Sequence, residues 1–201
     1  MPQTQPIYLI RHGQTDWNAE NRLQGQTDRP LNETGEAQAL SNGAFLRANL
    51  SEPISDFHFV ASPMLRTRQT MGLVRRGLGL PEESFQTDER LKELSFGDWE
   101  SHTFAELERN DPGVSQRREA DKWNFVPPGE GAESYEMLLQ RVRPWFDEMM
   151  DSEKSAICVS HGGILRCAFR LFGDLSQDEA AEMMVPQDRI AALRDGVIHW
   201  L

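Results

Sequence analysis

The sequence predicts an α/β fold in three layers, with a mainly parallel sheet, helices on both faces and an antiparallel edge strand. Short apolar runs typical of buried strands alternate with longer segments of helical periodicity. That alternation favours a parallel sheet covered on both sides. Near the C-terminus, Ile190–Leu193 and Val197–Trp200 flank Asp195-Gly196, a dipeptide typical of a hairpin turn. This hairpin accounts for the antiparallel edge.

The first strand is predicted at Ile7–Ile10. Residues 14–32 are rich in Asn, Gln and Asp, so we expect a polar loop there. Thr34 has a side chain suited to an N-cap and is predicted to start a helix. We expect the buried face of this helix to contain Ala37, Leu40 and Ala44.

A second strand is predicted at Phe57–Ala61 and a helix directly after it. Ser62 suits the N-cap of that helix and Pro63 its first position. This arrangement places Arg66 in the first helical turn, close to the end of the preceding strand. Segment Leu91–Trp99, which carries Glu93, is expected to be a loop or a short strand.

The next part of the chain, at about residues 98–134, is polar and contains several prolines. We expect an excursion over the active site, with a short helix opened by the capping box Thr103-x-x-Glu106. Ser134 is predicted to start a longer helix, which we expect to kink or break at Pro144. Its predicted apolar face consists of Leu138, Val142, Trp145, Phe146 and Met149.

The C-terminal part begins with another buried strand, Ala156–Ser160, followed by an apolar helix after His161. A further capping box, Ser176-x-x-Glu179, predicts one more helix start before the hairpin. We expect all 201 residues to form one domain, since this length supports a core of its own.

Composition narrows the possible functions. The formal net charge of −11 argues against a nucleic-acid or anionic-membrane partner. No apolar run approaches the roughly 20 residues that span a bilayer, and Met1–Pro6 lacks the features of a signal peptide, so we expect a cytoplasmic protein. Cys158 and Cys167 are expected to be buried, reduced thiols. No cysteine or histidine spacing predicts a metal site.

Two strand ends carry the residues suited to chemistry. Ile7–Ile10 runs into Arg11, His12 and Gly13, and Ala156–Ser160 runs into His161, Gly162 and Gly163. The carboxyl ends of strands in an open α/β sheet form the crevice in which ligands bind. Two histidines and an arginine delivered to one such edge indicate a site for phosphate chemistry.

A longer ordered set of residues, from about Ile7 to Leu171, resembles the histidine phosphatase superfamily, which includes the cofactor-dependent phosphoglycerate mutases. The set contains Arg11-His12-Gly13, Asn18, Gln24-Gly25, Ser62-Pro63-x-x-Arg66, Glu93 and His161-Gly162-Gly163. Any one of these motifs alone is weak, because short strings recur by chance. Their common order along one chain is specific.

The resemblance implies a role for each residue. His12 is the expected nucleophile, and Arg11, Arg66 and His161 the expected phosphate clamp. Glu93 is the expected proton donor to the leaving alkoxide, protonated once bound phosphate offsets the cations, and it then activates water. The remaining expected phosphate-binding residues are Asn18, Gln24, Gly25, Gly162 and Gly163. Purely structural readings stay open: a strand-capping histidine, surface ion pairs for the arginines, turn-forming loop residues, and an exposed Glu93 beside Lys92.

The implied activity is hydrolysis of a small phosphorylated metabolite through a phosphohistidine, with neither metal nor other cofactor. Three departures from the mutases favour hydrolysis: Gly163 where they have Asn, Gln24-Gly25 where they have Thr-Gly, and no tail after Leu201. Arg117-Arg118 favours the alternative, a mutase, because mutases use an arginine pair to bind a substrate carboxylate. A phospho-ligand or partner-binding protein without turnover is a third reading. The leaving group and the oligomeric state stay open.

Overall fold

The protein is built around a six-stranded sheet with the order β3-β2-β4-β1-β5-β6. The computed structural model describes residues 5–201, so most of Met1–Pro6, in which we expected no signal peptide, lies outside it. Strands β3, β2, β4 and β1 are parallel, and β5 and β6 add the antiparallel edge. The predicted sheet is therefore confirmed. The strands are β1 (Ile7–Arg11), β2 (His58–Ala61), β3 (Gln86–Thr87), β4 (Ala156–Ser160), β5 (Ile190–Arg194) and β6 (Val197–Trp200).

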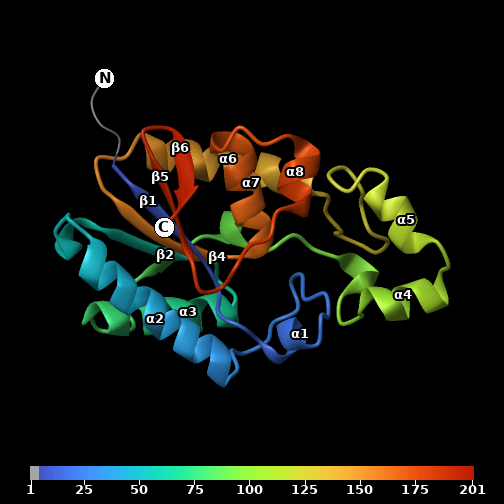
Figure 1. Ribbon diagram of the computed structural model, residues 1–201, viewed down its shortest axis with the longest axis horizontal. Helices are drawn as coiled ribbons and strands as arrows, with labels where there is room; N and C mark the ends of the chain where they lie inside the picture. The colour runs from blue at the N-terminus through green and yellow to red at the C-terminus, as the bar shows by residue number, and fades with distance from the viewer. Residues whose placement is uncertain (1–4) are drawn as a thin grey trace.

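Helices cover both faces of this sheet (Figure 1). One layer contains α2 (Glu33–Asn49) and α3 (Leu65–Leu78). The other contains α6 (Tyr135–Met150), α7 (Gly162–Phe172) and α8 (Gln177–Glu182). Alternate residues of β1 pack against the two helix layers, because successive side chains on a strand point to opposite faces of the sheet. Ile7 and Leu9 belong to the apolar core beneath α6 and α7, whereas Tyr8 and Ile10 belong to the core beneath α2 and α3.

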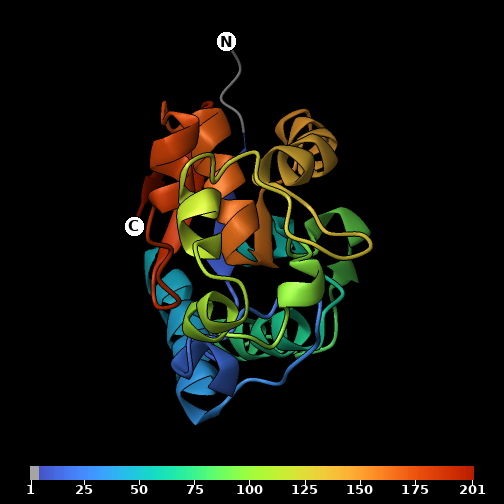
Figure 2. The same cartoon turned by 90° about the vertical axis from the view of Figure 1, so that its right-hand side faces the viewer.

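The segment from about residue 98 to 134 stands beside these layers and, in the view of Figure 2, in front of the sheet. It contains α4 (Phe104–Asn110) and α5 (Val114–Glu119). Trp99, Leu107 and Val114 form a small apolar cluster of their own. The segment thus has a small apolar core of its own, while its Trp123 belongs to the main core.

Several local predictions are confirmed, and each rests on short-range geometry. The capping boxes at Thr103/Glu106 and Ser176/Glu179 are formed. Asp195 and Gly196 both have positive φ, as a type I′ hairpin turn requires. Ser134 caps α6, whose predicted face is buried apart from the half-buried Met149. Cys158 and Cys167 are buried free thiols.

The predicted face of α2 is wrong. Ala37, Leu40 and Ala44 are exposed, and the buried positions are Gly35, Ala39, Asn42, Gly43 and Leu46. The helix begins at Glu33 and is capped by Asn32 rather than by Thr34. The hydrophobic pattern failed because α2 contacts α3 through small residues, with the helices close enough that a side chain at Gly43 would meet the Val74 carbonyl.

The start of α3 also differs from the prediction. Ser62 does not cap it, and the helix begins at Leu65. The Asp28 carboxylate accepts a hydrogen bond from the Leu65 N–H at 2.8–2.9 Å and so supplies the cap from a distant loop. Arg66 nevertheless lies in the first turn, as predicted.

Two further expectations need correction, and one alternative is settled. Residues 14–32 include one helical turn, α1 (Asp16–Ala19), closed by a Thr15/Asn18 capping box. For the segment from 91 to 99, predicted as a loop or a short strand, the structure has the loop: the 3-10 turns Glu89–Leu91 and Gly97–Trp99 flank an irregular stretch. Helix α6 continues through Pro144 without a break. Among residues 5–201, no helix combines the length and apolar character needed to cross a membrane.

The close α2–α3 contact generates a stability prediction for Gly43→Ala. Alanine normally stabilises a helix interior relative to glycine by roughly 1 kcal/mol. A β-carbon at Gly43, however, would lie 2.2 Å from the Val74 carbonyl oxygen and 3.0 Å from the Gly77 Cα. We expect Gly43→Ala to lower the free energy of unfolding by about 1–3 kcal/mol, measured by urea denaturation.

Gly72→Ala is the matched control, because Gly72 lies inside α3 and a β-carbon there would meet atoms only at 3.5 Å or more. We expect this variant to be stabilised by about 0.5–1 kcal/mol. Equal effects of the two substitutions would contradict the close helix contact.

Candidate active site

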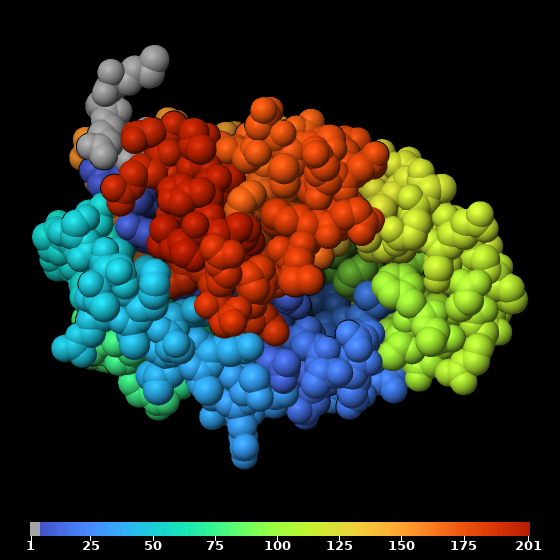
Figure 3. All heavy atoms as spheres, viewed as in Figure 1, coloured from blue at the N-terminus to red at the C-terminus, as the bar shows by residue number. Residues whose placement is uncertain are grey.

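A cavity of about 150 Å³ lies at the carboxyl ends of β1 and β4. On the face seen in Figure 3, the surface is hollowed where the blue N-terminal segment approaches the orange and yellow-green segments. A larger cavity of about 470 Å³, near Tyr8 and Arg194, contains none of the predicted site residues. The smaller cavity is lined by Arg11, His12, Asn18, Arg22, Leu23, Gln24, Gly25, Arg66, Glu93, Phe96, Gly162 and Arg166.

His12 lies directly after β1 and is held there by a 2.9 Å hydrogen bond from its N–H to the Ser160 carbonyl. Its Nδ1 lies 2.8 Å from the Gly13 carbonyl, which can only accept, so Nδ1 carries the proton and Nε2 keeps its lone pair. Burial, followed by the charges of Arg66 and Arg11, lowers the pKa of His12 well below its usual value. The ring is therefore neutral at pH 7, as a nucleophile requires.

Two arginines beside His12 are held by main-chain carbonyl oxygens. Arg66 is fully buried and donates to the Gly25 and Thr27 carbonyls at 2.7 and 3.0 Å, with its nearest carboxylate, Asp28, 3.8 Å away. Arg11 donates to the Val185 carbonyl at 2.7 Å. Burial lowers the pKa of Arg11 to about 10, so both side chains are cations at neutral pH. Carbonyl contacts position these charges without neutralising them.

His161 is the second histidine of the site, and its ring centroid lies 5.3 Å from that of His12. Its Nε2 pairs with the Ser62 hydroxyl at 2.8 Å. Burial and the nearby Arg66 lower the pKa of His161 well below its usual value. When the Ser62 hydroxyl donates to Nε2, Nδ1 carries the proton and is available as a neutral donor.

Four buried polar atoms in the described part of the chain lack a hydrogen-bond partner, and all belong to this site. They are Arg11 Nε, Arg66 Nε, His161 Nδ1 and Gln24 Oε1. Buried polar groups in folded proteins are nearly always paired, and an unpaired one costs roughly 1–3 kcal/mol. Two of these atoms belong to cationic guanidinium groups, so an anion fits them best.

Asn18 and the loop at Gln24–Gly25 form another wall. The Asn18 carbonyl oxygen accepts from the Thr15 N–H and from Gln187 Nε2, both at 3.1 Å, which leaves the Asn18 amide nitrogen to face a ligand. Gly25 has a φ of +51°, and a β-carbon there would lie 2.1 Å from a Glu100 oxygen. Glycine is therefore required where the loop crosses Glu100 and presents its carbonyl to Arg66.

Glu93 enters the cavity from the irregular stretch between the two 3-10 turns. Its Oε1 accepts from the Leu94 N–H at 3.0 Å, and both carboxylate oxygens lie 3.2 Å from the Gly163 nitrogen. A β-carbon at Gly163 would lie 2.3 Å from Glu93 Oε1. Gly163 therefore makes room for Glu93, and its N–H donates to that carboxylate, whereas the sequence predicts phosphate as its partner. Gly162 lines the cavity.

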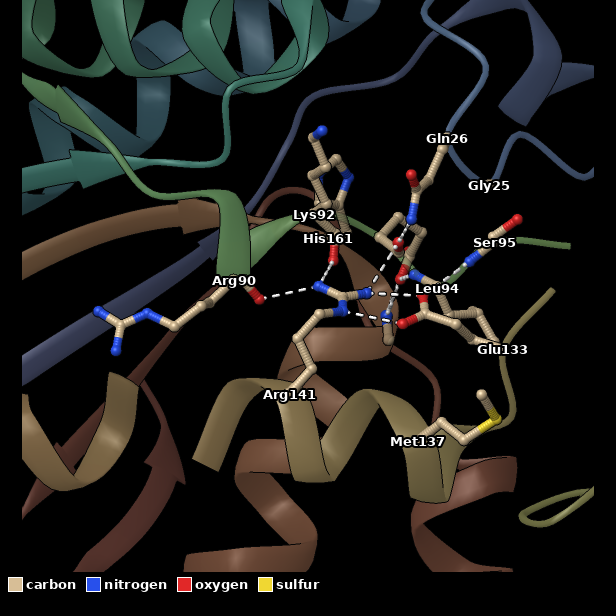
Figure 4. A network of polar contacts seen from close by, with 12 residues as sticks. Gly25, Gln26, Arg90, Lys92, Leu94, Ser95, Glu133, Met137, Arg141 and His161 are labelled. Atoms are coloured by element: carbon tan, nitrogen blue, oxygen red, sulfur yellow. Dashed lines mark hydrogen bonds and ion pairs between the residues drawn. The ribbon is translucent and has the colours of Figure 1, made fainter. Parts of the chain in front are cut away.

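Arg141 on α6 holds the main chain around Glu93, a role that sequence reasoning missed (Figure 4). Its guanidinium donates to the carbonyls of Arg90, Lys92 and Glu93 at 2.9, 3.0 and 3.2 Å. The same group forms two bonds of 2.7–2.8 Å to the Glu133 carboxylate, which also accepts from the Ser95 N–H at 3.1 Å. The partly buried ion pair between Arg141 and Glu133 thus holds the irregular stretch in place.

Sequence reasoning also missed other positioning residues. Glu100 accepts from Gln26, Thr27 and Phe96 main-chain N–H groups and so fixes the loop beneath Arg66. Ser62, Gln187 and Glu100 belong to segments distant from their partners in the sequence. The residues next to them in the sequence do not predict these contacts, except that Ser62 precedes the Arg66 motif.

The arginine pair that favoured a mutase is used elsewhere. Arg117 pairs with Asp111, and Arg118 pairs with Glu119 at 2.7 Å while its guanidinium lies 5.1 Å from the Phe104 ring centroid. Neither arginine, and no residue from 98 to 134, lines the cavity within the described chain. Instead, Glu106 of this segment forms an ion pair at 2.7 Å with Arg22, which lines the cavity.

This combination of a doubly covered sheet and two histidines among arginines defines a phosphate-handling α/β protein. The family model described as histidine phosphatase superfamily (branch 1) matches residues 7–194. The chain belongs to the histidine phosphatase superfamily.

Individual relatives agree with this membership. The chain is 32% identical over 163 residues to the "Probable phosphoglycerate mutase GpmB" of Salmonella choleraesuis, covering 80% of this chain and 71% of that protein. It is 31% identical over 187 residues to mouse 6-phosphofructo-2-kinase/fructose-2,6-bisphosphatase 1, covering 93% of this chain. The chain spans only 36% of the length of that bifunctional protein.

Solved structures show the same fold. A mycobacterial glucosyl-3-phosphoglycerate phosphatase in complex with vanadate superposes with a TM-score of 0.79 at 27% identity, over 98% of this chain and 96% of that one. Bacillus stearothermophilus YhfR gives 0.78 at 27% identity, over 97% and 94%. These comparisons confirm the prediction of an enzyme of the histidine phosphatase type.

The low pKa of the buried histidines generates a prediction on stability. An imidazole in the unfolded chain titrates near 6.5, whereas the folded protein keeps His12 neutral well below that pH. Below about pH 6.5 the unfolded state therefore binds more protons than the folded state. The free energy of unfolding therefore falls as the pH drops, by about 1 kcal/mol per such histidine between pH 7.5 and 5.5. In urea unfolding, His12→Gln should lose that much less stability than the wild type over this interval. An equal loss in both proteins would contradict a neutral His12.

The ion pair behind Glu93 generates a second prediction. Arg141→Met should lower kcat about 10- to 100-fold, because a small displacement of a reacting group is costly, while the inhibition constant of inorganic phosphate changes less than about threefold. Arg143→Met is the control, since Arg143 is exposed on the same helix. A large rise in the phosphate inhibition constant of Arg141→Met would show that Arg141 instead supports the cluster of His12, Arg11 and Arg66.

Proposed function

We propose that the protein hydrolyses a small phosphomonoester through a phosphohistidine on His12. The observation that carries this proposal is a neutral imidazole, with its Nε2 lone pair free, beside two buried guanidinium groups whose Nε atoms are unpartnered. This arrangement combines a nucleophile with fixed positive charge, which phosphoryl transfer requires.

In the proposed first step, His12 Nε2 attacks phosphorus as the bond to the leaving oxygen breaks. Arg11, Arg66 and His161 would donate to the equatorial oxygens, and Asn18, Gln24, Gly25 and Gly162 would complete the phosphate site. Glu93 would give its proton to the leaving alkoxide. In the second step, the Glu93 carboxylate takes a proton from water, whose oxygen attacks the phosphohistidine and releases phosphate and His12.

No metal is assigned to either step, because the protein's own guanidinium groups supply the positive charge. The named phosphatases among the structural relatives support hydrolysis of a small phosphorylated molecule. The similarity to a probable phosphoglycerate mutase favours a second candidate, transfer of the phosphoryl group to another hydroxyl. Against that candidate, Arg117 and Arg118 are paired away from the cavity.

The first experiment measures phosphate release from a panel of phosphomonoesters in the presence of EDTA, for the wild type and His12→Ala. We expect release that chelator does not abolish and that disappears in the variant. Denaturing the wild type during turnover of a ³²P-labelled ester should trap acid-labile, base-stable label on His12. Isomerisation of 3-phosphoglycerate without release would identify a mutase, and no turnover at all would favour a phospho-ligand-binding protein.

The acid role of Glu93 is tested by leaving-group dependence. Glu93→Gln should lower kcat for an alkyl phosphate about 10²- to 10⁴-fold, the usual contribution of general acid catalysis. The loss should be much smaller for p-nitrophenyl phosphate in single-turnover phosphorylation of His12, because p-nitrophenolate leaves without protonation. Equal losses for both esters would remove Glu93 from the acid role.

A further inference from the structure

Arg166 is a cation at the cavity that the phosphate chemistry does not use. It lies on α7 one turn after Gly162 and lines the same cavity as His12 and Glu93. Its Nε donates to the Met183 carbonyl at 3.2 Å, and its guanidinium lies 5.9 Å from the Tyr135 ring centroid. These contacts fix the side chain through Nε and one face, leaving the two terminal nitrogens available to a ligand.

The guanidinium of Arg166 stands next to the predicted phosphate clamp. A β-carbon built on Gly162 would lie 3.4 Å from Arg166 Nη1 and 3.7 Å from Arg11 Nε. Both cations thus flank the same point above Gly162. The positive charge of Arg166 also contributes to the lowered pKa of Arg11, second only to burial. An anionic ligand group held by Arg166 would relieve this repulsion.

The balance of charge at the cavity leaves Arg166 without a counterion. Arg22, the remaining arginine of the lining, is paired with Glu20 and Glu106 at 2.7 Å each. No carboxylate of residues 5–201 forms an ion pair with Arg166. Glu93, the carboxylate of the lining, is protonated in the proposed first step, so it offsets no charge there. A phosphate dianion matches the charges of Arg11 and Arg66. One positive charge therefore remains beside the phosphate position.

We propose that Arg166 binds a carboxylate carried by the leaving group, so that the substrate is a phosphorylated carboxylic acid. This inference rests on the proposed phosphatase activity. A carboxylate fits better than a second phosphate because its single negative charge equals the one that remains unmatched, and its two oxygens match the terminal nitrogens of a guanidinium. Phe96, on the cavity wall, adds an apolar surface for the carbon skeleton between the two anionic groups.

The test compares 3-phosphoglycerate with glycerol 3-phosphate, which has a hydroxymethyl group in place of the carboxylate. The wild type should prefer 3-phosphoglycerate in kcat/KM. Arg166→Gln should lower kcat/KM for 3-phosphoglycerate about 10- to 100-fold, change that for glycerol 3-phosphate less than threefold, and leave inhibition by orthovanadate unchanged. Arg170→Gln, which removes the same charge one turn further along α7, should preserve the preference.

Other outcomes overturn the inference. Equal losses for both esters, with weaker orthovanadate inhibition, would assign Arg166 to the reacting phosphate. A selective loss for propane-1,3-diol bisphosphate, with 3-phosphoglycerate unaffected, would assign it to a second phosphate. If the wild type hydrolyses none of the esters, p-nitrophenyl phosphate included, the proposed phosphatase activity is contradicted. Binding of 3-phosphoglycerate is then measured by calorimetry. Equal affinity of the wild type and Arg166→Gln would reject the carboxylate site independently of catalysis.

Discussion

The site depends on two arginines whose hydrogen bonds go to main-chain carbonyl oxygens and not to carboxylates. Arg66 is buried against the carbonyls of Gly25 and Thr27, and Arg11 donates to the carbonyl of Val185. A carbonyl dipole fixes the direction of a guanidinium but leaves its net charge intact, whereas a bidentate carboxylate would cancel it. Burial, together with this uncancelled charge, lowers the pKa of His12 and keeps its ring unprotonated, and the same charge favours an anion beside it.

Much of the surrounding structure keeps those carbonyl oxygens in place. Glu100 binds the loop that contains Gly25, and the Asp28 carboxylate caps the helix that carries Arg66. Arg141 binds the neighbouring irregular stretch around Glu93. Carboxylates such as those of Glu100 and Asp28 therefore lie one layer behind the cavity, where they position loops and a helix start. Glu93 is the single carboxylate of the cavity lining in the described chain.

The parts of the fold that followed correctly from the sequence are those governed by neighbouring residues. Capping boxes, the Asp195-Gly196 turn and the buried strand runs each depend on a few consecutive side chains. Helix α2 shows where this reasoning stops. Its apolar Leu40 faces solvent while Gly43 is buried, because the close approach of α3 selects small residues over hydrophobic ones. Likewise, serine is a residue type that often caps helices, but the Ser62 hydroxyl pairs with His161.

The sequence by itself placed Arg11, His12 and His161 at the ends of strands that any parallel sheet brings to one edge. Only the tertiary structure decided how they are held and charged. The tautomer of His12 depends on one carbonyl, and the place of Glu93 depends on an arginine on α6. Arg117 pairs with Asp111 away from the cavity, whereas Arg166 on α7 lines it. Such contacts join segments far apart in the chain, so no local pattern records them.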